Sequence, residues 1–254
     1  MTAARLLLPM LAAFWPAWKW WAGRILSDPE QAWGLVALAT AIALCWQAMN
    51  TTPPRWLPAV SLLLIVAFAV IWRAAPPLVA TTFAAASIGL VLSLCRGAAG
   101  SRAAILGLFA ISLPLFSTAE YLAGFPMRIA ASYLAQGMLG LAGIPIRVEA
   151  TALRWSGGIV EIGAPCSGIH MLWAGLFFGL AAAARRKLGW RRTAAAAVLS
   201  VAAILVGNGA RSAALFFLES GLVAVPPAAS SVLHTGVGLV VFSLTAILTL
   251  RCAR

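Results

Sequence analysis

Long apolar runs separated by short polar segments dominate the chain. Eight of them approach membrane-crossing length: residues 5–22, 32–49, 56–72, 77–95, 103–121, 167–184, 193–218 and 231–250. A helix needs about 20 mostly apolar residues to cross the hydrocarbon core of a bilayer. The pattern therefore predicts an all-α polytopic membrane protein with about eight transmembrane helices. Pro9 and Pro16 interrupt the first run, so residues 5–22 are expected either to span the membrane or to lie on its surface.

One long segment, residues 122–165, does not have the pattern of a membrane span. Apolar residues recur at helical spacing from Phe125 to Leu141, with Arg128 and Gln136 between them, which predicts a helix along the membrane surface. Alternating residues around the turn at Ser156 then predict a small hairpin. The chain 1–254 is thus expected to form one membrane domain, with five spans in 1–121, this loop in 122–165, and three spans in 166–254.

Composition and charge agree with a membrane location. The chain is 63% hydrophobic and 9% charged, with a mean hydropathy of +0.97, which excludes a soluble globular domain. Its net charge of +12 does not indicate nucleic-acid binding, because the basic residues lie between apolar runs and form no long basic tract. The four cysteines, at positions 45, 95, 166 and 252, lack the close spacing of a zinc site or a disulfide framework, and no cofactor or metal is expected.

The distribution of basic residues predicts the orientation. The strongest cluster, between Arg185 and Arg192, should be cytoplasmic, because short cytoplasmic loops are enriched in lysine and arginine. Counting spans from this cluster places these further basic residues on the same side: Arg5, Arg55, Arg96, Arg102, Arg251 and Arg254. Both termini are then cytoplasmic, the 122–165 loop is outside, and the expected host membrane is a bacterial inner membrane.

Candidate chemistry begins in the stretch from Glu161 to Met171, where a proline and a glycine bracket Cys166 and Ser167. A thiol in the first turn of a helix lies where unpaired N–H groups and the helix dipole favour its anion. A free cysteine is also often a small buried hydrophobic residue. Ser167 is a rival nucleophile, although a thiol is far more ionised near neutral pH.

Three polar residues on the last two spans should lie at the same outer depth as Cys166. Asn208 and Arg211 fall toward the outer end of the seventh span, and His234 lies in the first turn of the eighth. An arginine inside an apolar span costs about 2.5–3.5 kcal/mol on insertion scales, so it indicates a functional site. Alternatives stay open: Arg211 reaching lipid phosphates, Asn208 joining helices, and His234 acting only in packing.

Two further features near the cysteine allow competing interpretations. His170 lies four residues after Cys166 on the same helix face, so it competes with His234 as the general base. Gly175 and Gly179 form a small-residue pair that is expected only to pack helices.

The order of these motifs resembles the exosortase/archaeosortase family. Cys166-Ser167-Gly168, Asn208-x-x-Arg211 and His234-x-x-x-Gly238 follow one another on the last three spans, as in that family, and the Trp-rich start followed by Asp28-Pro29 is similar too. The resemblance implies that Cys166, Arg211 and His234 are catalytic. Asn208, Ser167 and Gly168 from the same motifs, and Glu161 and His170 beside them, are supporting candidates.

The resemblance implies a membrane-embedded cysteine protease or transpeptidase. Its partners would be membrane-anchored proteins with a C-terminal sorting signal of the PEP-CTERM type, made of a short motif, one transmembrane helix and a basic tail. Cleavage would occur at the outer face through a cysteine acyl-enzyme. Two alternatives remain: a transporter whose path is lined by Asn208, Arg211 and His234, and a membrane transferase of acyl groups or lipid head groups.

Overall fold

The computed structural model describes residues 2–95, 102–223 and 226–252, and it divides the chain into two compact units. The first unit contains Met1–Leu115 and Leu180–Ala196, and the second contains Phe116–Gly179 and Ala197–Arg254. Arg96 and Arg254, which contribute to the predicted orientation, lie outside the described residues.

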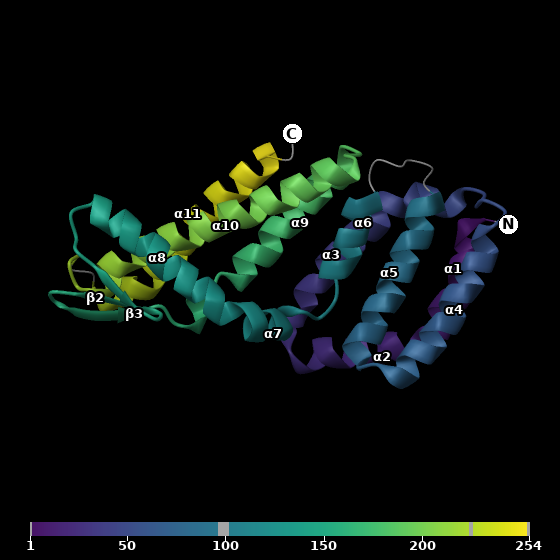
Figure 1. Ribbon diagram of the computed structural model, residues 1–254, viewed down its shortest axis with the longest axis horizontal. Helices are drawn as coiled ribbons and strands as arrows, with labels where there is room; N and C mark the ends of the chain where they lie inside the picture. The colour runs from purple at the N-terminus through teal and green to yellow at the C-terminus, as the bar shows by residue number, and fades with distance from the viewer. Residues whose placement is uncertain (1, 96–101, 224–225, 253–254) are drawn as a thin grey trace. The chain divides into compact units, whose positions relative to one another are not determined.

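The first unit begins with two short helices in place of the single run predicted at 5–22. These are α1 (Ala3–Ala13) and α2 (Trp15–Ser27), which meet at Phe14 (Figure 1). Pro16 explains the break, since proline lacks an N–H and favours the first turn of a new helix. The α1 end of the pair is tied to Thr51, whose carbonyl accepts from the N–H of Ala3. Lys19 and Arg24 of α2 lie near Trp72 and Pro77, where one long helix ends and the next begins.

The remaining helices of this unit follow in chain order. They are η1 (Pro29–Ala32), α3 (Trp33–Cys45), η2 (Trp46–Asn50), α4 (Leu57–Ala74), α5 (Pro77–Cys95) and α6 (Arg102–Ile111). Gly34 lies against the backbone of Ser112, and Gly89 lies against the ring of Phe109, so α6 packs closely on both α3 and α5.

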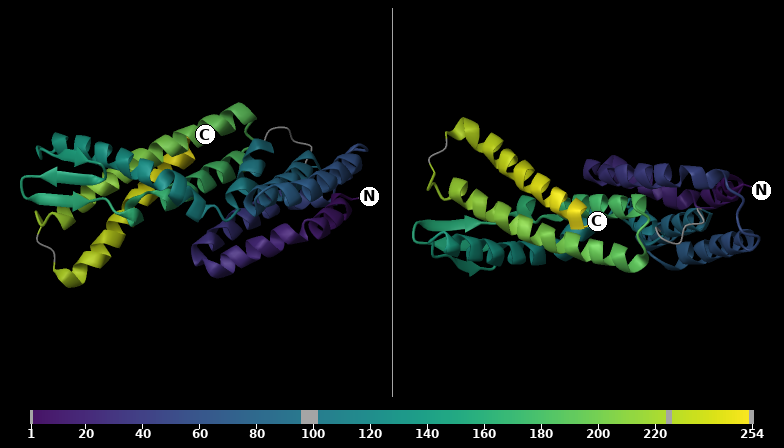
Figure 2. Two further views of the ribbon diagram at one scale, coloured as in Figure 1. Left: turned by 60° about the horizontal axis from the view of Figure 1, so that its bottom comes forward. Right: turned by 90° about the horizontal axis from the view of Figure 1, so that it is seen from above.

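The second unit joins a helical bundle to a small sheet (Figures 1 and 2). Its helical segments are α7 (Phe116–Ala119), the π-helical turn η4 (Glu120–Gly124), α8 (Phe125–Leu141) and the 3₁₀ turn η5 (Ala164–Cys166). Parts of α9 (Ile169–Arg185) and α10 (Trp190–Glu219), and all of α11 (Pro227–Cys252), complete the bundle.

The predicted hairpin is instead a three-stranded antiparallel sheet. Its strands are β1 (Arg147–Glu149), β2 (Ala152–Trp155) and β3 (Gly158–Glu161), in that spatial order. The sequence suggested the turn at Ser156, but it did not reveal the first turn, where Ala150 adopts a φ of 55°. Leu153 and Val160 on the inner face pack against α8 and against Phe216 of α10, so the sheet has a core of its own.

Glycines allow the helices of the second unit to approach one another. An added Cβ would collide with Ile204 at Gly175, with Thr245 at Gly207 and with Leu134 at Gly209. The packing role predicted for Gly175 and Gly179 is confirmed, because a Cβ on Gly179 would also lie 2.9 Å from the hydroxyl of Ser200. Close backbone contact of this kind is how helices associate in membranes.

Five helices among the described residues are long and apolar enough to cross a membrane. They are Leu57–Ala74, Pro77–Cys95, Ala164–Arg185, Trp190–Glu219 and Val232–Arg251, and a sixth is obtained if Arg102–Ile111 and Phe116–Leu141 form one broken span. The chain is therefore an all-α membrane protein, but the count of eight spans is not confirmed. Residues 5–22 and 32–49 give shorter helices, and the run 103–121 is broken near Pro114.

Candidate active site

Cys166 lies in a tight turn that precedes α9. It ends the 3₁₀ turn η5, in which its N–H donates to the carbonyl of Gly163, and α9 begins only at Ile169. Cys166 thus lies in the first turn of the candidate span Ala164–Arg185, as predicted, but in its 3₁₀ part and not in α9. Gly168 separates the two with a φ of +82°, a conformation that favours glycine and that starts a new chain direction.

Asn208 of α10 holds this turn from the side. Its Nδ2 donates to the carbonyls of Cys166, at 3.0 Å, and of Ser167, at 3.3 Å. The side chain is buried, and its amide lies only 2.7 Å from the position that a Cβ on Gly168 would occupy. Gly168 is therefore required both by its backbone angle and by the space that Asn208 fills.

Arg211, one turn further along α10, reaches the same backbone. Its Nη1 donates to the carbonyl of Pro165 at 3.4 Å. Its Nε is buried and has no hydrogen-bond partner among the described residues. The guanidinium also contacts α11, because a Cβ on Gly238 would lie 3.5 Å from Nε. Arg211 thus lies between the cysteine turn and Gly238 of α11.

His234 lies on α11 one turn before Gly238, on the helix face that carries this arginine contact. The helix α11 begins at Pro227, but the candidate span begins at Val232, so His234 lies in the first turn of the span as predicted. Its Nδ1 is 4.0 Å from Oε1 of Glu219, which ends α10, and both side chains are partly exposed.

A second carboxylate, Glu120, is anchored to the cysteine turn from η4. Its Oε2 accepts a hydrogen bond from Oγ of Ser167 at 2.7 Å, and Ser167 is buried. The carboxylate lies against Gly124, where a side chain would collide with it. Single π-helical turns are frequent at functional sites. A rival nucleophile would need an exposed hydroxyl. The hydroxyl of Ser167 is instead buried and hydrogen-bonded to Glu120, which positions the turn.

The thiol itself has an apolar side and a charged side. Cys166 is partly buried against the cluster formed by α8, the sheet and α10, which includes Leu139, Ile162 and Phe216. Arg211 and Glu219 both lie within electrostatic range of its sulfur. The sulfur therefore lies between the apolar cluster on one side and two opposite charges on the other.

The three motifs of the sequence thus meet within the second unit. A comparison with protein-family models matches residues 7–251 to the transmembrane exosortase family. The chain belongs to this family. It is therefore a multi-pass membrane protein of a group of membrane-embedded, sorting-related enzymes, and the resemblance suggested by its motifs is confirmed. No curated protein and no solved structure matches the chain.

Two of the supporting candidates lie apart from these contacts. His170 is exposed on α9, and its ring packs against Phe116 of α7 with centroids 5.1 Å apart. Glu161 ends β3 with an exposed side chain and is in register with Ala152. The described contacts join the cysteine turn to Asn208 and Arg211 of α10. Arg211 in turn lies beside α11, the helix of His234. In the described part of the chain, no hydrogen bond or ion pair joins Glu161 to these residues.

Sequence reasoning missed the two carboxylates that flank this site. Glu120 and Glu219 each stand next to a long apolar run in a chain that has only 6 acidic residues, and this rarity was the available signal. Carboxylates near membrane spans are costly and usually have a partner. Their partners, Ser167 and His234, lie 47 residues and 15 residues away in sequence, so only the fold identifies them.

Proposed function

We propose that the chain is a membrane-embedded cysteine protease or transpeptidase that cleaves C-terminal sorting signals. Its proposed substrates carry a short motif, one transmembrane helix and a basic tail, and cleavage takes place at the outer face of a bacterial inner membrane. The observation that carries this proposal is the convergence on one turn: Asn208 and Arg211 bind the carbonyls of Pro165, Cys166 and Ser167, and Arg211 also contacts the helix of His234.

In the first step, the Cys166 sulfur attacks the carbonyl carbon of the scissile peptide bond. His234 takes the thiol proton through Nε2 and then delivers it to the departing nitrogen as the C–N bond breaks. The products are a thioester on Cys166 and the released C-terminal segment with a new amino terminus. Glu219 stabilises the imidazolium that forms between these two proton transfers, because its carboxylate lies beside Nδ1.

Arg211 supplies the positive charge for the tetrahedral intermediate. The guanidinium stands at the cysteine turn, where its Nη1 donates to the carbonyl of Pro165. The developing oxyanion of the substrate would accept from this group. A donor positioned before the reaction begins needs no reorganisation, which is the main advantage of an oxyanion site.

In the second step, an acceptor amine or water attacks the thioester carbonyl. His234 takes a proton from this nucleophile and returns it to the sulfur as the C–S bond breaks, so the enzyme is restored. Attack by an amine gives transpeptidation and attack by water gives hydrolysis. The choice depends on which acceptor reaches the thioester first.

The decisive test is processing of a reporter protein that carries the matching sorting signal. Cys166→Ala should abolish cleavage, whereas Cys45→Ala, at a buried cysteine of the first unit, should leave cleavage unchanged. Immunoblots would follow the size shift of the reporter, with the amount of membrane-inserted enzyme as the control. Cleavage at the wild-type rate by Cys166→Ala would exclude the cysteine mechanism.

A further inference from the structure

We infer that a segment of the substrate adds to the sheet of the second unit as a fourth strand, paired in parallel with β3. The segment is the extended stretch that precedes the substrate's transmembrane helix. The inference rests on the proposed function, because it names the place where the proposed substrate would lie. Three observations carry it: the backbone pattern of the sheet, the difference between its two edges, and the path of the chain from β3 to Cys166.

The backbone pattern gives β3 an outer edge with unused hydrogen-bonding groups. In an antiparallel ladder, residues that exchange hydrogen bonds alternate with residues whose N–H and C=O groups point the other way. The N–H of Ile162, just after β3, donates to the carbonyl of Thr151. By alternation Val160 also bonds with β2, whereas the N–H and C=O groups of Ile159 and Glu161 point away from it. In the part of the chain that the structure describes, no hydrogen bond uses these four groups.

The outer edge of β1, on the other side of β2, is partly covered. The same alternation directs the backbone groups of Ile146 and Val148 outward. The carbonyl of Ile146 already accepts from Nε2 of Gln136, on α8, at 2.8 Å. The edge of β3 has no such bond among the described residues, and its Ile159 is 56% exposed. Because an open edge is a template for pairing with another chain, β3 is the edge suited to an added strand.

The path of the chain decides between parallel and antiparallel pairing. After β3 the chain makes the cysteine turn and then continues in the apolar span Ala164–Arg185 (Figure 1). The proposed substrate has the same order: an extended segment, the scissile bond and a transmembrane helix. Parallel pairing along β3 therefore directs the scissile bond toward Cys166. Antiparallel pairing would direct it toward the turn at Gly157, at the other end of β3.

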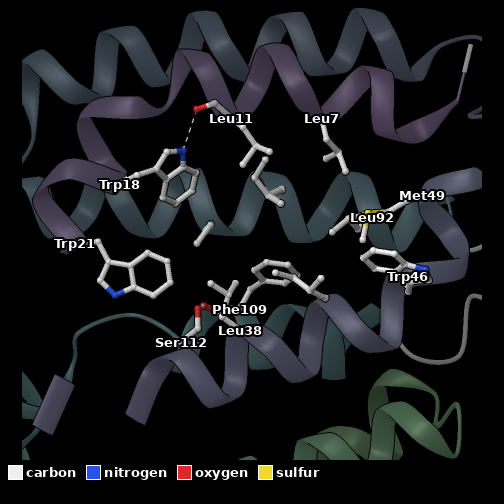
Figure 3. A pocket seen from close by; sticks show the side chains of 13 residues that line it. Leu7, Leu11, Trp18, Trp21, Leu38, Trp46, Met49, Leu92, Phe109 and Ser112 are labelled. Atoms are coloured by element: carbon white, nitrogen blue, oxygen red, sulfur yellow. Dashed lines mark hydrogen bonds between the residues drawn. The ribbon is translucent and has the colours of Figure 1, made fainter. Parts of the chain in front are cut away.

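An apolar slot in the first unit is less suited to this segment (Figure 3). Its volume is about 450 Å³, and leucine, isoleucine and aromatic side chains form most of its walls. Trp18 of this slot already donates its Nε1–H to the carbonyl of Leu11 at 3.0 Å, the dashed line in Figure 3. A peptide backbone placed there would leave most of its N–H and C=O groups unpaired, which is costly in a buried place. The edge of β3 instead offers donors and acceptors in the same unit as Cys166.

Proline on each edge strand tests the pairing. In Glu161→Pro the outward N–H is lost and the ring fills the space of an added strand, while the bonds from β3 to β2 remain. This variant should raise the apparent KM for the reporter protein about tenfold, and Val148→Pro, which makes the same change on β1, should leave it within about twofold. Thermal unfolding would confirm that both variants fold. An unchanged KM in Glu161→Pro would overturn the inference and would leave the cysteine mechanism, which Cys166→Ala tests, in place.

Photocrosslinking remains decisive if Glu161→Pro fails to fold. The reporter would carry benzoylphenylalanine at one position at a time before the scissile bond, and the enzyme would be Cys166→Ala, so that the substrate stays uncut. Positions far from the scissile bond should give adducts near Ile159, and closer positions should give adducts near Glu161. The reverse order would overturn the parallel direction, and adducts confined to residues outside β3 would overturn the pairing. Because this measurement needs no cleavage, it separates a failure of the strand pairing from a failure of the cysteine mechanism.

Discussion

At the residue scale, two side chains of α10 hold the cysteine turn through hydrogen bonds to its backbone. Asn208 uses its amide on two backbone carbonyls, and Arg211 uses one nitrogen on the backbone while keeping Nε unpaired. The two residues are three apart on α10, so they lie on one face of the helix. The amide of Asn208 therefore holds the carbonyls of Cys166 and Ser167, and the guanidinium of Arg211 holds that of Pro165.

Arg211→Lys should reduce processing about a hundredfold, the usual cost of losing one oxyanion donor. Lysine keeps the charge but lacks the planar fork that contacts Pro165 and presents Nε at the same time. Single-turnover rates on a reporter substrate would measure the loss, with Arg128→Lys on α8 as the matched control. Near-normal turnover by Arg211→Lys would reduce Arg211 to a general source of positive charge.

The two histidines should differ in their effect on rate. His234→Ala is expected to cost about a hundredfold or more, as loss of a general base does, whereas His170→Ala should cost little. His234 shares α11 with the Arg211 contact, while the ring of His170 packs on Phe116. The same reporter assay compares the two variants at equal enzyme abundance. A larger loss for His170→Ala would assign the base to His170.

At the scale of elements, the cysteine turn is held by its neighbours more than by its own helix. The thiol precedes α9, and its carbonyls are bound by α10, while Ser167 is bound by Glu120 of η4. The motif residues were predictable because their types and order were visible in the sequence. The turn itself was not, since the positive φ of Gly168 and the contact with Glu120 depend on segments that meet only after folding.

Gly168→Ala should separate activity from stability. The left-handed conformation costs an alanine about 1–2 kcal/mol, and its methyl group would also collide with Asn208. Gly143 has a similar φ of +80° but nothing within 4 Å of its absent Cβ, so Gly143→Ala carries the strain without the collision. Thermal unfolding should show both variants destabilised, and only Gly168→Ala should lose processing. Equal activity in the two variants would argue against the role of Asn208.

At the scale of the whole molecule, the predicted class and family are confirmed, whereas the predicted count of eight spans is not. Hydropathy detects apolar runs, but it does not detect the break at Phe14 or the one near Pro114, where proline ends a helix inside an apolar stretch. The three-stranded sheet was missed for a similar reason, because strands of three or four residues leave too short an alternating pattern.

Orientation is tested by two single cysteines in a variant that lacks the four natural ones. A cysteine at Ser156, in the turn between β2 and β3, should react with a membrane-impermeant thiol reagent on intact spheroplasts. A cysteine at Gly189, between α9 and α10 in the basic loop, should react only after lysis. Both positions are exposed, so access to the reagent does not distinguish them. The opposite result would place the cysteine turn at the cytoplasmic face.

The hydrogen bonds from α10 to the cysteine turn can form only late in synthesis. Cys166 leaves the ribosome before Asn208 and Arg211, so the turn lacks its clamps until α10 has entered the membrane. Sliding α10 by one turn, about 5.4 Å, would break all three clamping bonds together. A half-inserted chain would therefore carry Cys166 without the three hydrogen bonds that shape its turn.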